Sequence, residues 1–199
     1  KGWDENKLDM FRRHIIQLGT TGVFVIYDEL EGKEAVTWSY LLHTVELPME
    51  IQELTDEVKV IGKNKAGGVS VAHLFSSAKT EQAMVDTFFC APTNWKNVTN
   101  AQGKALKYPN HWHFSSTTVP CKTARFLTVM DTHGKNRPDM QVVRKGNTIQ
   151  VGDWTITCNL TEKGKAAIYV SNKTEKVSLN YDAGKKEGAT TVTDQVKGK

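Results

Sequence analysis

Short runs of apolar residues alternate with polar positions along most of the chain, and glycine, asparagine or proline separates one run from the next. A period of two with frequent turn residues is typical of antiparallel β-strands. Residues 23–27 are different, because every position is apolar or aromatic, which predicts a strand with both faces covered. The pattern predicts an all-β chain: an antiparallel β-sandwich with a smaller C-terminal antiparallel sheet.

Turn residues set the expected boundaries of the strands. In the first part of the chain we expect strands at residues 12–18, 23–27, 36–44, 58–61, 68–75, 111–115 and 123–130. The first three have short connections and should form an antiparallel meander, whereas residues 81–90 fit a strand or a short helix. The composition changes near residues 131–138, and shorter strands are expected at 141–144, 148–158, 166–170, 177–181 and 189–193. These observations predict a β-sandwich domain at residues 1–140 and a small antiparallel sheet at residues 141–199.

Composition and charge exclude several classes of function. No apolar run is long enough for a membrane-spanning helix. The net charge of +4 is too small and too evenly spread to indicate nucleic acid binding. Cys90, Cys121 and Cys158 are widely spaced and form no CxxC motif, so they give no zinc or redox signature. We expect neither nucleic acid nor a membrane among the partners.

The segment His111-Trp112-His113 is the most specific local feature. In a strand, both imidazoles would lie on one face and could contact one ligand or metal ion. A zinc site needs a third ligand that the spacing does not supply, so we predict no metal site. The alternative is a half-exposed strand in which Trp112 points inward and the histidines face solvent.

Aromatic residues flank the polar segment before this strand. Trp95, Tyr108 and Trp112 stand among asparagine, lysine and histidine residues. Flat aromatic faces beside polar side chains are what a sugar-binding surface needs, although such residues are more often core or loop anchors. We therefore name Trp95, Trp112, His111 and His113 as candidates for carbohydrate contact.

Two further groups of polar residues permit alternative interpretations. Asp28 and His43 end two of the expected strands; such a pair can orient a catalytic imidazole, but turn capping is the commoner role. The run Arg12-Arg13-His14 could clamp an anionic ligand or form the solvated face of a strand. The sequence contains no phosphate-binding glycine loop, GxSxG elbow or HExxH motif, and we assign no catalytic residue.

Several longer stretches resemble the C-terminal β region of the heparinase II/III-like polysaccharide lyases. These are residues 11–18, 23–30 and 38–44, which show an Arg-led apolar strand, a strand ending in Tyr-Asp and a strand ending in Leu-His. Residues 110–114 and 126–130 are similar to the same region. The resemblance covers about the first 130 residues, and the remaining part matches only as a β-rich tail.

The resemblance implies a larger enzyme that cleaves acidic polysaccharides such as heparin, heparan sulfate or alginate by β-elimination. In that family an (α/α) toroid and upstream sandwich strands carry the catalytic Tyr and His and a zinc site of two His and one Asp. This sequence contains neither family motif for those groups, H-x-H-x-D-A-G or A-H-N. We therefore expect this chain to be non-catalytic and to hold no cofactor, with the toroid as its intramolecular partner and a bacterial periplasmic or secreted location. The alternative is a free-standing carbohydrate-binding module.

Overall fold

The computed structural model describes residues 7–45, 47–86, 101–104, 111–185 and 190–194. Within these residues the chain is all-β and its strands pair antiparallel in three sheets, which confirms the predicted fold class. None of the described residues forms a helix long and apolar enough to cross a membrane.

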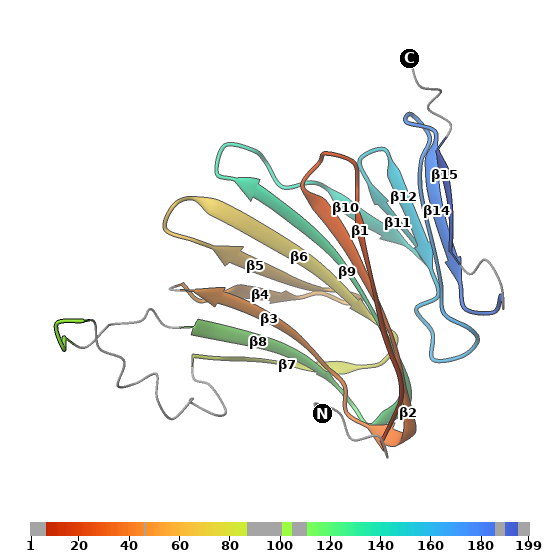
Figure 1. Cartoon of the computed structure of the whole chain (residues 1–199), viewed down its shortest axis with the longest axis horizontal. Helices are drawn as coiled ribbons and strands as arrows, with labels where there is room; N and C mark the ends of the chain where they lie inside the picture. The colour runs from red at the N-terminus through yellow and green to blue at the C-terminus, as the bar shows by residue number, and fades with distance from the viewer. Residues whose placement is uncertain (1–6, 46, 87–100, 105–110, 186–189, 195–199) are drawn as a thin grey trace.

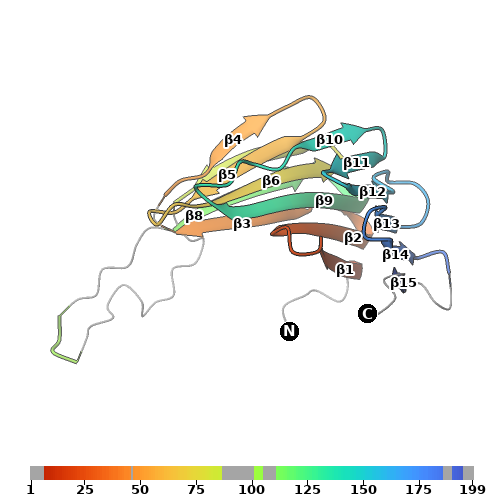
Figure 2. The same cartoon turned by 90° about the horizontal axis from the view of Figure 1, so that it is seen from above.

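A central sheet of six strands runs through the molecule. Its order is β1-β2-β9-β6-β5-β4, and Figure 2 shows these strands side by side in that order. The strands are β1 (Leu8–Gln17), β2 (Val23–Val36), β9 (Cys121–Gly134), β6 (Gly68–Ser76), β5 (Val58–Lys63) and β4 (Glu50–Glu53).

Two further sheets pack on the central sheet (Figure 1). The three-stranded sheet has the order β3-β8-β7, and the C-terminal sheet follows the chain from β10 to β15. The strands of the first are β3 (Ser39–Val45), β8 (His111–Thr118) and β7 (Thr80–Val85). Those of the second are β10 (Val142–Lys145), β11 (Thr148–Val151), β12 (Trp154–Cys158), β13 (Ala167–Asn172), β14 (Val177–Asp182) and β15 (Thr190–Asp194).

The central sheet separates two hydrophobic cores. Successive side chains of a strand point to opposite faces, so Phe126 of β9 packs toward the three-stranded sheet and Leu127 toward the C-terminal sheet. The predicted double coverage of residues 23–27 is only partly right. Val23, Val25 and Tyr27 are fully buried against the C-terminal sheet, but Phe24 and Ile26 on the other face are half-buried.

The predicted three-strand meander is wrong in its third member. β1 pairs with β2, but β3 pairs with β8, which lies about seventy residues later in the sequence. The chain leaves the central sheet at Trp38, whose backbone N–H donates to Thr118 Oγ1 and whose indole Nε1 donates to the carbonyl of Cys121. These bonds direct the chain into the second layer.

Other boundaries also differ from the sequence prediction: β4 was not predicted, and β1, β2, β8 and β9 extend beyond the expected ranges. The single strand expected at residues 148–158 is divided into β11 and β12 by a tight turn at Gly152, whose φ of +54° favours glycine. The ambiguous segment 81–90 begins as the strand β7, and its residues 87–90 lie outside the described residues.

The predicted domain boundary near residue 140 falls in the connection between β9 and β10. The C-terminal sheet nevertheless shares one core cluster with the central sheet, in which Tyr27 and Leu127 join Ile156 and Ile168. The two-domain division stays a prediction.

Candidate functional site

The outer face of the three-stranded sheet carries three histidines. His43 on β3 stands directly opposite His113 on β8, and His111 lies two residues earlier on β8. Cross-strand partners and residues two apart share a face, so all three imidazoles lie on one side. The ring centroids of His43 and His113 are 4.4 Å apart in an edge-to-face arrangement. We call these three residues the histidine face.

Valines border the histidine face. Val85 of β7 is the strand partner of His113, and Val45 of β3 is the partner of His111. Both valines are exposed. Farther along the strands the same face carries Leu41, Ala83 and Ser115, and then Ser39, Thr117 and Glu81.

The imidazoles influence one another. Partial burial lowers the pKa of His113, and the neighbouring His43 and His111 lower it further because like charges repel. The described residues contain no group of three His, Cys, Asp or Glu side chains arranged to hold a metal ion. The arrangement is suited to contact with a polar or anionic ligand.

Trp112 does not share this face. Trp112 lies on the inner side of β8 with Phe114 and packs against the core beneath the three-stranded sheet. Its indole Nε1 is buried and has no hydrogen-bond partner among the described residues. Trp95 lies outside the described residues. Carbohydrate contact by either tryptophan stays a prediction.

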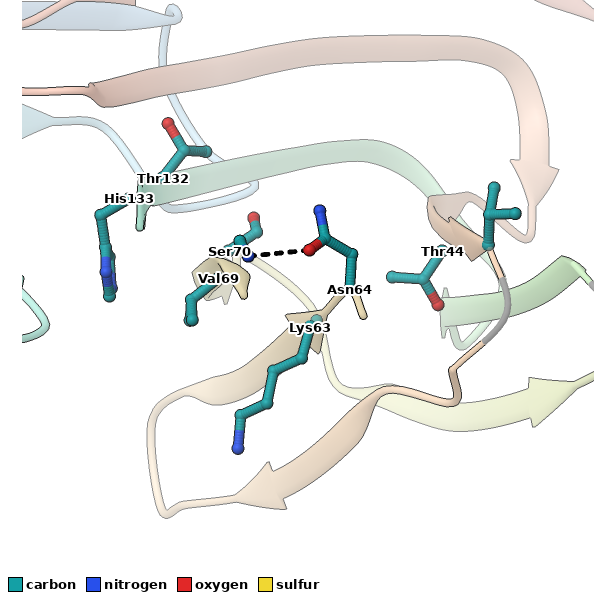
Figure 3. A pocket seen from close by; sticks show the side chains of 10 residues that line it. Thr44, Lys63, Asn64, Val69, Ser70, Thr132 and His133 are labelled. Carbon is teal, nitrogen blue, oxygen red and sulfur yellow. Dashed lines mark hydrogen bonds between the residues drawn. The ribbon is translucent and has the colours of Figure 1, made fainter. Parts of the chain in front are cut away.

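A pocket opens where β3 ends and where β5 turns into β6. Its lining includes Val45, which is the strand partner of His111. It has a volume of about 570 Å³ and lies at the edge of the sandwich (Figure 3). We call it the end pocket. Ten residues line it: Thr44, Val45, Gly62, Lys63, Asn64, Gly68, Val69, Ser70, Thr132 and His133.

The space in the end pocket depends on Gly62. Gly62, Ser70 and Thr132 are cross-strand neighbours in one row of the central sheet. A Cβ atom on Gly62 would lie 2.9 Å from Cγ2 of Thr44, which is closer than side chains normally approach. Glycine at this position therefore lets β3 approach β5 and keeps this part of the pocket open.

Polar groups of the end pocket are held in fixed orientations. Asn64 Oδ1 accepts from the backbone N–H of Gly68 at 2.8 Å, and its amide nitrogen points away from that bond (Figure 3). Thr44 and Thr132 donate their hydroxyl hydrogens to the carbonyls of Leu47 and Gly22. Each hydroxyl oxygen keeps acceptor capacity, so the lining offers both donors and acceptors to a ligand rich in hydroxyl groups.

The charges of the two ends of the sandwich differ. None of the ten residues that line the end pocket is an Asp or Glu, and Lys63 is exposed at its rim. The adjoining shallow hollow contains Lys135, whose side chain lies 3.1 Å from the Cβ position of Gly67. At the other end of β5, a second pocket is lined by Glu53, Asp56 and Glu57 among others.

His133 has a structural role in this region. Its side chain is buried, with Nδ1 2.8 Å from the carbonyl oxygen of Gly134 and Nε2 3.1 Å from the carboxylate of Asp139. It therefore anchors the end of β9, while Lys63 and Asn64 provide the polar groups of the rim.

The polar residues of β1 contact carboxylates of this same chain. Arg13 forms a bidentate ion pair with Asp28, and Arg12 contacts Glu29 and the hydroxyl of Tyr181. The sequence allowed Arg12 and Arg13 to clamp an anionic ligand. In the structure these two arginines contact the carboxylates of Glu29 and Asp28 instead. Asp28 and His43 belong to different sheets and do not form a catalytic pair.

Sequence reasoning identified His111 and His113 but not the end pocket or the place of His43 on the same face. His43 was visible as a polar residue near the end of a strand, yet only the pairing of β3 with β8 shows its position. No protein-family model matches this chain, and no curated protein shows significant sequence similarity to it.

Proposed function

We propose that this chain is the non-catalytic C-terminal β portion of a polysaccharide lyase, and that the end pocket and histidine face form part of the wall of a cleft for an acidic polysaccharide. The observation that carries this proposal is the lining of the end pocket, which contains hydroxyl and amide groups, no carboxylate among its ten described residues, and Val45, the strand partner of His111. The resemblance to the heparinase II/III-like lyases supports the same class of ligand.

The charge distribution favours an acidic ligand. Lys63 and Lys135 lie at the end pocket and the adjoining hollow. The connection from β7 to β8, residues 86–110, contributes three lysines and one acidic residue, Asp86, in sequence. A local excess of one sign of charge attracts ligands of the other sign and raises their local concentration.

The chemistry of the pocket fits a sugar. Sugar hydroxyls need both donors and acceptors, which Thr44, Ser70, Thr132 and Asn64 provide within one cavity. The apolar faces of sugar rings can contact the side chains of Val45 and Val69 in the same lining.

Lyase chemistry belongs, in this proposal, to the parent protein. β-Elimination needs a base for the C5 proton, an acid for the leaving oxygen and a group that neutralises the uronate carboxylate. The resemblance places those groups on an upstream toroid, whose host would be a periplasmic or secreted bacterial enzyme. The chain alone should therefore bind the polysaccharide without cleaving it.

A free-standing carbohydrate-binding module is the second candidate. Such a module would bind its sugar at the same end pocket, whose lining offers hydroxyl and amide groups. Covalent attachment to an upstream toroid that carries a Tyr and a His distinguishes the lyase portion from such a module.

Calorimetric titration with heparin, heparan sulfate and alginate tests the proposal, with neutral dextran as the negative ligand. Lys63→Gln should weaken binding of the acidic polymers by about twofold to fivefold, which is the effect of losing one exposed charge contact. Lys145→Gln on the exposed edge of the C-terminal sheet is the matched control and should have little effect. Equal binding of dextran, or absence of binding to every acidic polymer, would contradict the proposal. Ultraviolet absorbance of the unsaturated product should stay at the blank level in the same mixtures.

A further inference from the structure

We propose that the shallow hollow beside the end pocket is a second subsite, which holds the sugar units that follow along the same acidic polysaccharide. This inference rests on the proposed function, because it extends that binding site and sets the length of ligand that the site takes. The hollow has a volume of about 440 Å³. Seven residues line it, and we call it the glycine hollow: Ala66, Gly67, Gly68, Gly134, Lys135, Asn136 and Arg137.

The end pocket and the glycine hollow are neighbours at the ends of β6 and β9. Gly68 lines both cavities and is the strand partner of Gly134. The adjacent pair on the same face of the central sheet, Ser70 with Thr132, lines the end pocket. Two residues of a strand span roughly 7 Å. A ligand that leaves the end pocket along these strands therefore reaches the glycine hollow directly.

Glycine at position 134 has no explanation within the fold. Its φ is not positive, and a Cβ atom added there would have no other atom within 4 Å. Each other glycine that the structure describes has either a positive φ or an atom within 3.0 Å of its Cβ position. The carbonyl of Gly134 accepts from the N–H of Arg137 and so begins a turn, but the first residue of a β-turn need not be glycine.

Close approach of a ligand to the backbone would account for this glycine, since a strand glycine often marks such a place. A side chain at position 134 would lie on the same face of β9 as Thr132, which lines the end pocket. It would occupy the space through which a longer sugar chain passes from the end pocket into the glycine hollow.

A lysine supplies charge to the glycine hollow. Lys135 is exposed, lines the hollow and forms no ion pair with any residue that the structure describes. Lys63 lines the end pocket. A polysaccharide that spans both cavities meets one lysine in each, which favours a chain with negative charge on successive units.

Acidic residues beside the turn after β9 already contact cations of this chain. The buried carboxylate of Asp131 accepts from the guanidinium of Arg137, and Asp139 lies 3.8 Å from Nζ of Lys59. These cations weaken the repulsion between the two carboxylates and an anionic ligand. Glu46, near the end pocket in sequence, lies outside the described residues.

The experiment is calorimetric titration of the full chain with heparin-derived oligosaccharides of two and four sugar units. The shorter ligand fills the end pocket, whereas the longer ligand also gains the contacts of the glycine hollow. The wild-type protein should bind the tetrasaccharide about tenfold more tightly than the disaccharide, a modest gain for the added atoms.

Three variants test the subsite. Gly134→Leu fills the glycine hollow, and thermal unfolding should show unchanged stability because the new side chain begins in open space. It should bind the disaccharide as the wild type does and the tetrasaccharide no more than about twofold better. Lys135→Gln should weaken only the tetrasaccharide, by about twofold to fivefold. Gln150→Leu adds the same side chain at an exposed position of β11 and should keep the full gain.

The outcomes separate this inference from the proposed function. If Gly134→Leu keeps the full tetrasaccharide gain, or weakens both ligands equally, the inference is wrong but the proposed function stands. An unchanged tetrasaccharide affinity in Lys135→Gln would overturn the inference even if Gly134→Leu failed to fold. If neither oligosaccharide binds the wild-type protein, the proposed function fails as well.

Discussion

Arg13 and Asp28 form a bidentate ion pair across the first two strands of the central sheet. Nε and Nη2 of Arg13 donate to the two carboxylate oxygens of Asp28 at 2.6 and 2.7 Å. Asp28 is buried, whereas the side chain of Arg13 is 41% exposed. The Arg13 guanidinium also lies 5.6 Å from the ring centroid of Tyr40 on β3. This residue therefore links the edge of the central sheet to the three-stranded sheet.

Loss of Arg13 should destabilise the fold. Arg13→Gln leaves the carboxylate of Asp28 buried without its main partner, and we expect the free energy of unfolding to fall by about 1–3 kcal/mol. Urea unfolding followed by intrinsic fluorescence measures this change. Asp28→Asn should cost less when introduced into the Arg13→Gln protein than into the wild type. Additive effects of the two substitutions would show that the pair is not coupled.

Tyr181 fastens the C-terminal sheet to the central sheet. Its hydroxyl donates to Glu29 Oε2 at 2.9 Å and accepts from Arg12, and its ring lies 4.1 Å from that of His14. Tyr181→Phe keeps the ring but removes both bonds, so thermal unfolding should reveal a loss of about 1–2 kcal/mol. Tyr169→Phe, on an exposed position of β13, is the control and should change stability little. A similar loss for both variants would argue against this role of the hydroxyl.

Stability should decrease as the pH falls below about 6.5, the ordinary histidine pKa. Burial is the main cause that lowers the pKa of both His14 and His113 in the folded chain. The unfolded chain therefore takes up protons at a higher pH than the folded chain, and this contribution is complete above about 6.5 and lost below it. Urea unfolding between about pH 7 and pH 5 should show a smaller loss for His14→Gln/His113→Gln than for the wild type. A parallel decline of both proteins would exclude these histidines as the source.

Gly62→Ala should disturb both packing and ligand binding. The new methyl group would press against Cγ2 of Thr44 and push β3 away, and overpacking of this kind costs about 1–3 kcal/mol. Thr44→Ser removes that methyl group while keeping the hydroxyl, so it should restore much of the stability of Gly62→Ala. Thermal unfolding measures the four proteins. If the single Gly62→Ala variant kept full stability, the close approach between position 62 and Thr44 would not restrict the packing of β3 on β5.

Local patterns were sufficient to predict most strands. The turn at residues 64–67 separates β5 from β6 as its Asn and Gly residues indicate, and the apolar run at residues 123–130 lies within β9. These features depend on neighbours in sequence, which turn chemistry and a period of two describe well. The inward position of Trp112 and the outward position of the two histidines also follow from the alternation along β8.

Long-range pairing could not be predicted in the same way. Nothing near residue 43 in the sequence indicates that residue 113 is its strand partner. The pairing of β3 with β8 depends on the chain passing from the central sheet to the three-stranded sheet at Trp38. The end pocket has the same origin, since its walls come from β3, β5, β6 and β9. All four strands gave a local strand signal, but the place where they meet gave none.

Mapping the bound polysaccharide by NMR tests the central claim most directly. The isotope-labelled chain is titrated with a heparin-derived oligosaccharide, and the backbone amide shifts are followed residue by residue. We predict that the changes concentrate at His43, His111, His113, Ser70 and Thr132, around the end pocket and the histidine face, and leave β10 to β15 unchanged. Changes centred on the C-terminal sheet, or no specific changes at saturating oligosaccharide, would contradict the account.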